Sequence, residues 1–516
     1  MKFLAFLGQK AVLIWSFLLF LLLGLSSLFV RTNMPMDGSE LANMQANGPI
    51  FFVSLVLFIG LLYLCLRSLA FVKESYLFLF GTLFYLALGA YVILHQNDVL
   101  RHDALAVLEA AKALNRGDYS ILTEVSGYLH KYPHQLGLVS FERLILTLFG
   151  ESNVKVFFII NLVMAIADNF FLWKITQNLF KKDNISKIVL LLSFVFLPHL
   201  FNILFVYGLT YGLFFALIGL YFLQLYFDKK SWSNLLLSTV FLSLSDIIRN
   251  NYIILIITVL IVLMLDFLYH KTKKNLAFMV ILLASIIAGN RAISSYYQQV
   301  ARVDHLDGEP KVAWIAMGLN DTPIYNRVAG WYDAYVETVY NEHQGDAEAI
   351  EEASERQIVS RVTYMVKHPD YAWNFFKNKF LSTWTDSLFE SIWSGPVTKM
   401  PVEGQKITGR LMTSIYQGKL AYQIIYYFSA LLLVVIYVSV LPSIWTQYRQ
   451  KDGMTVFLLI PLIYLTGGFI FHLIWETKSQ YVYPYVYLLL PLSALGLDYM
   501  MTLVIKKEDM MIKMTK

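Results

Sequence analysis

Long apolar runs alternate with short polar connections along nearly the whole chain. A helix of about 20 apolar residues can cross a bilayer, because it satisfies its backbone hydrogen bonds internally. The pattern predicts about twelve such helices. Their expected ranges are 11–30, 50–71, 76–94, 154–173, 188–206, 209–227, 232–248, 252–268, 276–288, 421–441, 454–474 and 481–503.

Basic residues cluster in every second connection between these runs. The clusters are Lys2 and Lys10, Arg67 and Lys73, Lys181, Lys182 and Lys187, Lys229 and Lys230, Lys271, Lys273 and Lys274, Arg449 and Lys451, and Lys506 and Lys507. Because basic loops favour the cytoplasmic side, the pattern predicts a multi-pass protein of the cell membrane with both termini in the cytoplasm.

Two long polar stretches divide the apolar pattern, and both fall on the expected outer face. We therefore expect an all-α polytopic membrane protein with three N-terminal transmembrane helices (1–95), an outer-face loop containing an amphipathic helix (96–153), six transmembrane helices (154–289), a larger outer-face loop domain (290–420), three C-terminal transmembrane helices (421–504) and a cytoplasmic tail (505–516).

Composition agrees with a membrane location. Of the 516 residues, 57% are hydrophobic and only 15% are charged, which is unusual for a soluble globular protein. The expected partner is the lipid bilayer, and nothing supports binding to nucleic acid. Cys65 is the single cysteine, so no disulfide can form within the chain. The first apolar run is too long for a signal-peptide core and lacks a cleavage site, which favours a retained helix.

Two carboxylates, Asp98 and Asp103, follow directly on the third apolar run. Polar groups at the membrane surface are costly and are candidates for function. Asp103 opens an amphipathic pattern that ends near Gly117. It could supply a reactive carboxylate or merely cap this helix. Asp98 could equally be a local loop contact.

Further charges lie at the outer ends of two later helices. Arg249 could reach the interface, pair with Asp246 three residues earlier, or bind a phosphate through two hydrogen bonds. Glu476 and Lys478 precede Tyr481, and their alternative explanation is an aromatic belt with ordinary interfacial charges. The histidines show no metal-ligand spacing, and no Gly-rich phosphate loop, zinc motif or Ser-His-Asp grouping appears.

The string DALAVLEAAKALNRGDYSILTEVSGYLHKYPHQLGLVSFERLILTLFG resembles the first extracytoplasmic loop of polytopic glycosyltransferases of the C superfamily. These include bacterial relatives of the dolichyl-phosphate-mannose protein mannosyltransferases and the lipid A aminoarabinose transferases. The matching elements, in order, are Asp103, Gly117 with Asp118, Tyr132 with Pro133, Leu136 with Gly137, and Phe149 with Gly150. This order favours Asp103 over Asp98.

The similarity continues to the end of the chain. The string ETKSQYVYPYVYLLLPLSAL is similar to a late Glu-x-x-x-Arg-Tyr element of these enzymes, with Gln480 in place of the Arg and Lys478 as the available cation. The middle loop resembles that of a Gram-positive branch.

The resemblance implies an inverting transfer of sugar from a polyprenyl-phosphate-linked donor to an acceptor on the outer face. The acceptor would be a cell-wall or teichoic-acid polymer or a secreted protein. Asp103 would be the catalytic base, with Asp98 as the alternative. Arg249 and Lys478 would bind the donor phosphate. The expected substrate pocket contains His134, Tyr132, Gln135, Glu476 and Tyr481. A requirement for a divalent cation is left open.

Two other classes of function are compatible with the same residues. A transporter or flippase of a lipid-linked sugar would line a path with such charges, and transporters often show internal repeats and interrupted helices. The sequence predicts neither repeats nor interrupted helices. A structural subunit of an envelope complex is the third class.

Overall fold

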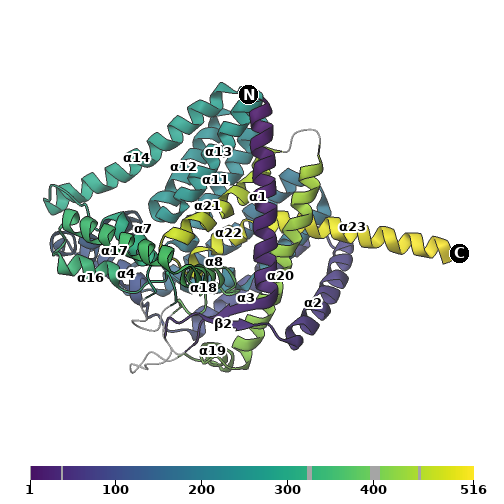
Figure 1. The fold of residues 1–516 in the computed structure, drawn as a ribbon, viewed down its shortest axis with the longest axis horizontal. Helices are drawn as coiled ribbons and strands as arrows, with labels where there is room; N and C mark the ends of the chain where they lie inside the picture. Colours follow the sequence, from purple (N-terminus) through teal and green to yellow (C-terminus); the bar gives the residue numbers. More distant parts are fainter. Residues whose placement is uncertain (1, 37–38, 322–327, 396–406, 451–454, 516) are drawn as a thin grey trace.

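The computed structural model describes residues 2–36, 39–321, 328–395, 407–450 and 455–515, and it is built almost entirely of helices (Figure 1). Among the described residues, ten helices are long and apolar enough to cross a membrane, or eleven if one bent pair is counted as a span. One further apolar helix, Trp232–Ile248, is shorter than these spans. The expected multi-pass architecture is therefore confirmed, whereas the count of twelve is not.

The N-terminal region contains three candidate spans and a hairpin. Its elements are α1 (Lys2–Phe29), β1 (Val30–Asn33), β2 (Asn43–Ala46), α2 (Pro49–Ser68), η1 (Leu69–Phe71) and α3 (Glu74–His95). The antiparallel hairpin was not expected from the sequence, because its strands are short and polar. The Thr32 amide donates to the Thr385 carbonyl at 3.1 Å, so contacts distant in sequence support it.

The first polar stretch folds into short helices. They are α4 (His102–Asn115), α5 (Ser120–Thr123), α6 (Tyr128–Lys131), η2 (Pro133–Gln135) and α7 (Leu136–Phe149). The amphipathic helix therefore begins at His102, one residue before the start expected from the sequence. Gly117 follows its end with a φ of 77°, which a glycine adopts without strain.

Six expected spans follow, and one of them is interrupted. The elements are α8 (Lys155–Phe180), α9 (Asp183–Val195), α10 (Leu197–Phe201), η3 (Asn202–Leu204), α11 (Leu209–Lys229), α12 (Trp232–Ile248), η4 (Asn250–Tyr252), α13 (Ile253–His270) and α14 (Lys273–Ala301). The segments Asp183–Val195 and Leu197–Leu204 meet at 50°. The expectation of uninterrupted helices is wrong here, because Phe196 leaves the helical conformation two residues before Pro198.

The remaining chain forms the stretch that is expected to be the outer loop domain, and the last candidate spans. The elements are α15 (Lys311–Gly318), α16 (Tyr335–Glu342), α17 (Ala347–Lys367), α18 (Pro369–Trp384), α19 (Arg410–Tyr416), α20 (Leu420–Arg449), η6 (Val456–Leu459), α21 (Ile460–Ile474), η7 (Ser479–Tyr481), α22 (Tyr483–Tyr487) and α23 (Leu490–Thr515).

Two helices run beyond the boundaries expected from hydropathy. Helix α14 continues to Ala301, past the expected limit of 288. Its last turns are polar, so the apolar pattern did not include them. Helix α23 continues through the expected tail to Thr515. Hydropathy marks the apolar part of a helix, and the backbone hydrogen bonds extend further.

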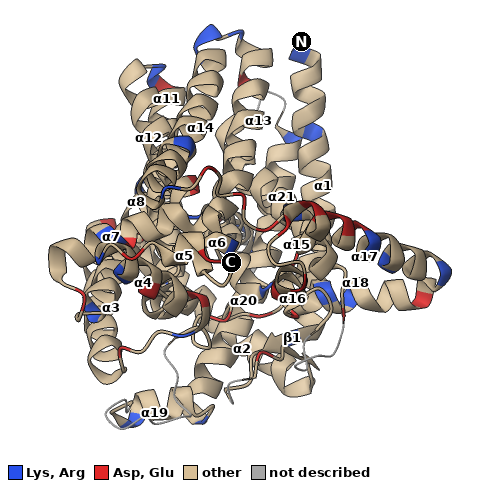
Figure 2. Cartoon of the chain, turned by 90° about the vertical axis from the view of Figure 1, so that its left-hand side faces the viewer, with Lys and Arg blue, Asp and Glu red and all other residues tan. Residues whose placement is uncertain are grey.

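Some of the basic residues lie at the end of the helices where the N-terminus also lies, and others lie around the polar stretches (Figure 2). Lys10 donates to the Tyr448 carbonyl, and Lys274 donates to the carbonyl of Lys230 at 2.9 Å. The first contact joins α1 to the end of α20, and the second joins the start of α14 to the end of α11. Lys451, from one expected basic cluster, and the start of the range 454–474 lie outside the described residues.

Candidate active site

Two glycines let the outer segments close on the ends of the spans. A Cβ on Gly137 would lie 1.8 Å from the backbone oxygen of Ile247, so a larger residue would separate α7 from α12. A Cβ on Gly318 would lie 2.4 Å from the carbonyl carbon of Trp475. These close contacts bring η2 and the outer loop domain onto the ends of α12 and α21.

Asp103 lies in the first turn of α4, a few residues after the end of α3. Arg101 is the N-cap residue, and no side chain caps the helix, so Asp103 is not the cap that the pattern also allowed. Its side chain is accessible to solvent although protein surrounds it closely. Burial raises the pKa of the Asp103 carboxyl, whereas the charges of Lys478 and Arg249 lower it. The carboxyl thus combines access to water with two cations nearby.

Arg249 caps the C-terminal end of α12 and contacts aromatic rings rather than an acid on its own helix. Its guanidinium carbon lies 4.3 Å from the centre of the Tyr207 ring and 5.9 Å from that of Tyr481. The residue is 7% exposed. Asp246 forms no ion pair with Arg249 among the described residues; the charge that acts on it is Lys311. The guanidinium is therefore available to an anion.

Lys478 lies between α21 and η7, surrounded by carboxylates. Its ammonium forms an ion pair with Glu40 and lies 5.3 Å from the centre of the Tyr332 ring. Burial alone would lower the pKa of Lys478, but Glu40, Glu476 and Glu390 raise it far above its usual value. Because Glu40 already balances this charge, a donor phosphate would compete with a carboxylate for Lys478.

The expected pocket residues of η2 join a hydrogen-bonded group. The Gln135 amide donates to the Tyr207 hydroxyl at 2.9 Å, and the Tyr132 hydroxyl donates to Glu337 at 3.0 Å. The ring of His134 lies next to Gln135, with 3.3 Å between Nε2 atoms. Burial lowers the pKa of His134 to about 4. This histidine is therefore neutral near pH 7 and suited to hydrogen bonding.

The late outer segment places Glu476 and Tyr481 in the same neighbourhood. Burial raises the pKa of Glu476 to about 7, and its amide donates to the Trp314 carbonyl at 3.2 Å. Gln480, which stands where the resemblance expects an Arg, accepts a hydrogen bond from Ser394 at 3.2 Å. It therefore contributes to the packing of this segment and supplies no cation.

The candidate side chains come from distant parts of the chain. Asp103, Arg249 and Lys478 lie in different segments, and Asp103 interacts electrostatically with each of the two cations. Comparison with known protein families, curated proteins and solved structures finds no match to this chain. The chemistry is therefore argued from the geometry of these residues.

Asp98 occupies a different environment from Asp103. It lies in the extended segment between α3 and α4 with an exposed side chain. The charges that act most strongly on Asp103 are Lys478, Glu337 and Arg249, and Asp98 is not among them. Of the two acids, Asp103 is the one on which the cations Lys478 and Arg249 act electrostatically.

Three residues near this site were missed in the sequence. Glu40 and Glu337 lie in segments that are expected on the outer face. Their expected location on the same side as Lys478 and Asp103 was the only signal in the sequence that these residues could lie close together. Lys379, in α18, donates to the carbonyls of Gly318, Leu473 and Trp475, at 2.5, 3.1 and 2.8 Å. It fixes the segment that carries Glu476.

The described residues contain no group of three or more His, Cys, Asp or Glu side chains that could bind a metal ion. The carboxylates around Lys478 face an ammonium instead. This donor set does not fit a divalent cation held by the protein alone.

Proposed function

We propose that this protein is an inverting glycosyltransferase that moves a sugar from a polyprenyl-phosphate donor to a hydroxyl acceptor on the outer face of the cell membrane. The observation that carries the proposal is the position of Asp103. Its carboxyl is accessible to solvent, does not cap α4, and lies within the field of Arg249 and Lys478.

In the proposed reaction, Asp103 accepts the proton of the acceptor hydroxyl as that oxygen attacks the anomeric carbon. The bond between this carbon and the phosphate oxygen breaks, and its electron pair leaves with polyprenyl phosphate. The configuration inverts because attack and departure occur on opposite faces. A carboxyl with a raised pKa is a better proton acceptor than an ordinary one.

Arg249 is the best candidate for binding the leaving phosphate. A buried guanidinium can make two charge-assisted hydrogen bonds to a phosphate, and no acid of its own helix neutralises it. Lys478 has the weaker claim, because Glu40 is already its partner. We assign Lys478 to the stabilisation of the carboxylates around it, with phosphate binding as a secondary role.

A lipid-borne donor suits this location. Arg249 follows directly on α12, and Glu476 and Lys478 follow α21. A polyprenyl chain between the spans would present its phosphate at this level. The proposed partners are therefore this donor, the bilayer and an acceptor polymer or protein of the cell envelope.

The proposed sidedness can be tested by thiol labelling in a Cys65→Ser background. We expect Asn341→Cys to react with a membrane-impermeant reagent in intact cells, because Asn341 is exposed in the outer loop domain. Lys229→Cys, exposed at the basic end, should react only after permeabilisation. The opposite pattern would contradict the orientation.

A flippase of a lipid-linked sugar is the second candidate, and one observation favours it. The interrupted span lies beside polar side chains within the bundle: His199 of α10 is 3.8 Å from Asp168 of α8. Interrupted helices with buried polar groups are common in transporters.

Reconstitution separates the two candidates. Purified protein in vesicles would receive a short-chain polyprenyl-phosphate sugar and candidate acceptors. Release of polyprenyl phosphate with formation of a glycosylated product supports the transferase. Movement of intact donor between leaflets without cleavage supports the flippase.

A further inference from the structure

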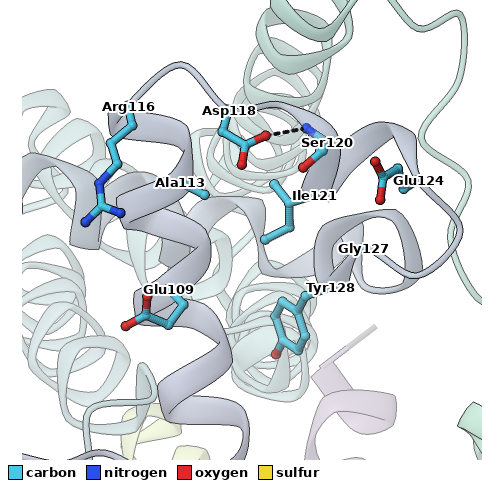
Figure 3. Close-up of a pocket in the computed structure, with 9 residues that line it drawn as sticks. All are labelled: Glu109, Ala113, Arg116, Asp118, Ser120, Ile121, Glu124, Gly127 and Tyr128. Carbon is cyan, nitrogen blue, oxygen red and sulfur yellow. Dashed lines mark hydrogen bonds between the residues drawn. The ribbon is translucent and has the colours of Figure 1, made fainter.

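A hollow of about 420 Å³ opens at the C-terminal end of α4 (Figure 3). It lies between the last turns of α4 and the turn that joins α5 to α6. The lining residues are Glu109, Ala113, Arg116, Asp118, Ser120, Ile121, Glu124, Gly127 and Tyr128. None of the residues assigned above to the reaction lines it.

The walls of this hollow are fixed by local contacts. Asp118 accepts the Ser120 amide at 3.0 Å, which shapes the turn after α4. A Cβ on Gly127 would lie 2.3 Å from the Ile121 carbonyl oxygen, so the opposite wall is closely packed at a glycine. The hollow is therefore preformed and need not be ordered by a ligand.

The charge inside the hollow is negative. Three carboxylates line it. Glu109 is paired with Lys112 at 2.9 Å, and the one cation among the lining residues, Arg116, is paired with Glu151 at 2.7 Å, so Asp118 and Glu124 leave an excess of negative charge. In the part of the chain that the structure describes, the Glu124 carboxylate forms no ion pair. Carboxylates only accept hydrogen bonds, so the hollow favours a ligand rich in hydroxyl or amino groups and repels phosphate.

Tyr128 connects the hollow to the proposed site. It lines the hollow and is also within electrostatic reach of Tyr207 and Asp103. Along α4, a rise of 1.5 Å per residue separates Asp103 from Glu109 by about 9 Å and from Ala113 by about 15 Å. A ligand that reaches both places must be an extended chain.

We propose that this hollow is an acceptor-binding site, and that the acceptor is a glycan chain that is uncharged or carries amino groups rather than a phosphate-rich polymer. The inference rests on the proposed function. An acceptor hydroxyl would meet Asp103 while the next units of the chain lie along α4 and against the ring of Tyr128.

Binding to full-length protein in nanodiscs tests the inference. The probes are short oligomers of glucose, galactose, N-acetylglucosamine and glucosamine, with a glycerol-phosphate oligomer as the anionic comparison. We expect saturable binding of at least one sugar oligomer and at least tenfold weaker binding of glycerol phosphate. Preference for glycerol phosphate, or binding of none of the sugars, would overturn the inference.

Matched variants locate the binding. Glu124→Gln and Tyr128→Leu should each weaken sugar binding at least threefold, and Glu124→Lys should improve glycerol-phosphate binding. Glu355→Gln, at an exposed carboxylate of α17, should change neither. Unchanged affinities in all three hollow variants would exclude this location.

Donor cleavage separates failure of the inference from failure of the function. If sugar oligomers bind in the hollow but polyprenyl phosphate is never released, the transferase proposal fails and the binding site remains. If transfer occurs while the acceptor KM is unchanged in Glu124→Gln and Tyr128→Leu, the inference fails alone.

Discussion

Two groups of polar residues, one around Asp103 and one around Asp168, differ in access to solvent and in charge. Around Asp103, a solvent-accessible carboxyl faces Arg249 and Lys478. Around Asp168, in the middle of α8, the side chain is 0% exposed, and neither carboxyl oxygen has a hydrogen-bond partner among the described residues. Its nearest basic group is His199, with 3.8 Å between Nε2 and Oδ2.

The difference indicates which group can exchange protons and bind an ionic substrate. A carboxyl beside cations at the ends of the spans can lose a proton to water and regain it. A carboxyl sealed between helices has no such exchange, and an unpaired charge there would cost several kcal/mol. Aromatic residues, Tyr483 and Tyr487, surround the sealed group. We therefore assign the chemistry to the Asp103 group.

The largest effect is expected from Asp103→Asn. This change keeps the shape of the side chain but removes the proton-accepting charge, so sugar transfer should fall by about 10²–10⁴-fold. Donor binding and the unfolding temperature in detergent should remain near those of the wild type. Asp98→Asn is the matched control and should retain most transfer. An inactive Asp98→Asn beside an active Asp103→Asn would reverse the assignment.

A smaller but clear effect is expected from Arg249→Ala. Hydrogen bonds to charged groups contribute about 1.5–3 kcal/mol, which corresponds to about 10–100-fold in donor affinity. Equilibrium binding of a short-chain polyprenyl-phosphate analogue measures this loss. Arg356→Ala, on the exposed face of α17, is the control. Unchanged donor affinity in Arg249→Ala would leave the aromatic contacts as the only role of this residue.

Asp168→Asn tests the sealed side of the comparison. The substitution preserves shape and removes only the ability to ionise, so the transfer rate should stay within the same order of magnitude. The same reconstituted assay measures it. Loss of transfer, or loss of donor movement between leaflets, would show that the sealed group is functional and would favour the flippase.

The smallest effects concern the pH dependence of kcat/KM. Asp103 must be deprotonated to act as a base, so activity should fall as pH drops through its raised pKa. Glu337 raises this pKa and Lys478 lowers it. Glu337→Gln should therefore shift the acid limb to lower pH, and Lys478→Met should shift it to higher pH. Glu355→Gln should leave it in place. Shifts in the opposite directions would mean that another group titrates.

The sequence determined the features that depend on local composition and period. The lengths of the apolar runs predicted a multi-pass helical protein, and the structure confirms it. The amphipathic pattern after His102 placed α4 and Asp103 within one residue of the observed start. Each of these signals is contained in a window of a few turns, because hydropathy and helical period act locally.

Only the tertiary structure decided which side chains meet. Glu40 and Lys478 come from opposite ends of the chain, and Arg249 contacts Tyr207 rather than the nearby Asp246. The break at Phe196 likewise lies in a run that reads as continuous. Hydropathy cannot specify these contacts, because the pairing of charges and rings depends on helix packing, which brings together residues that are far apart in sequence.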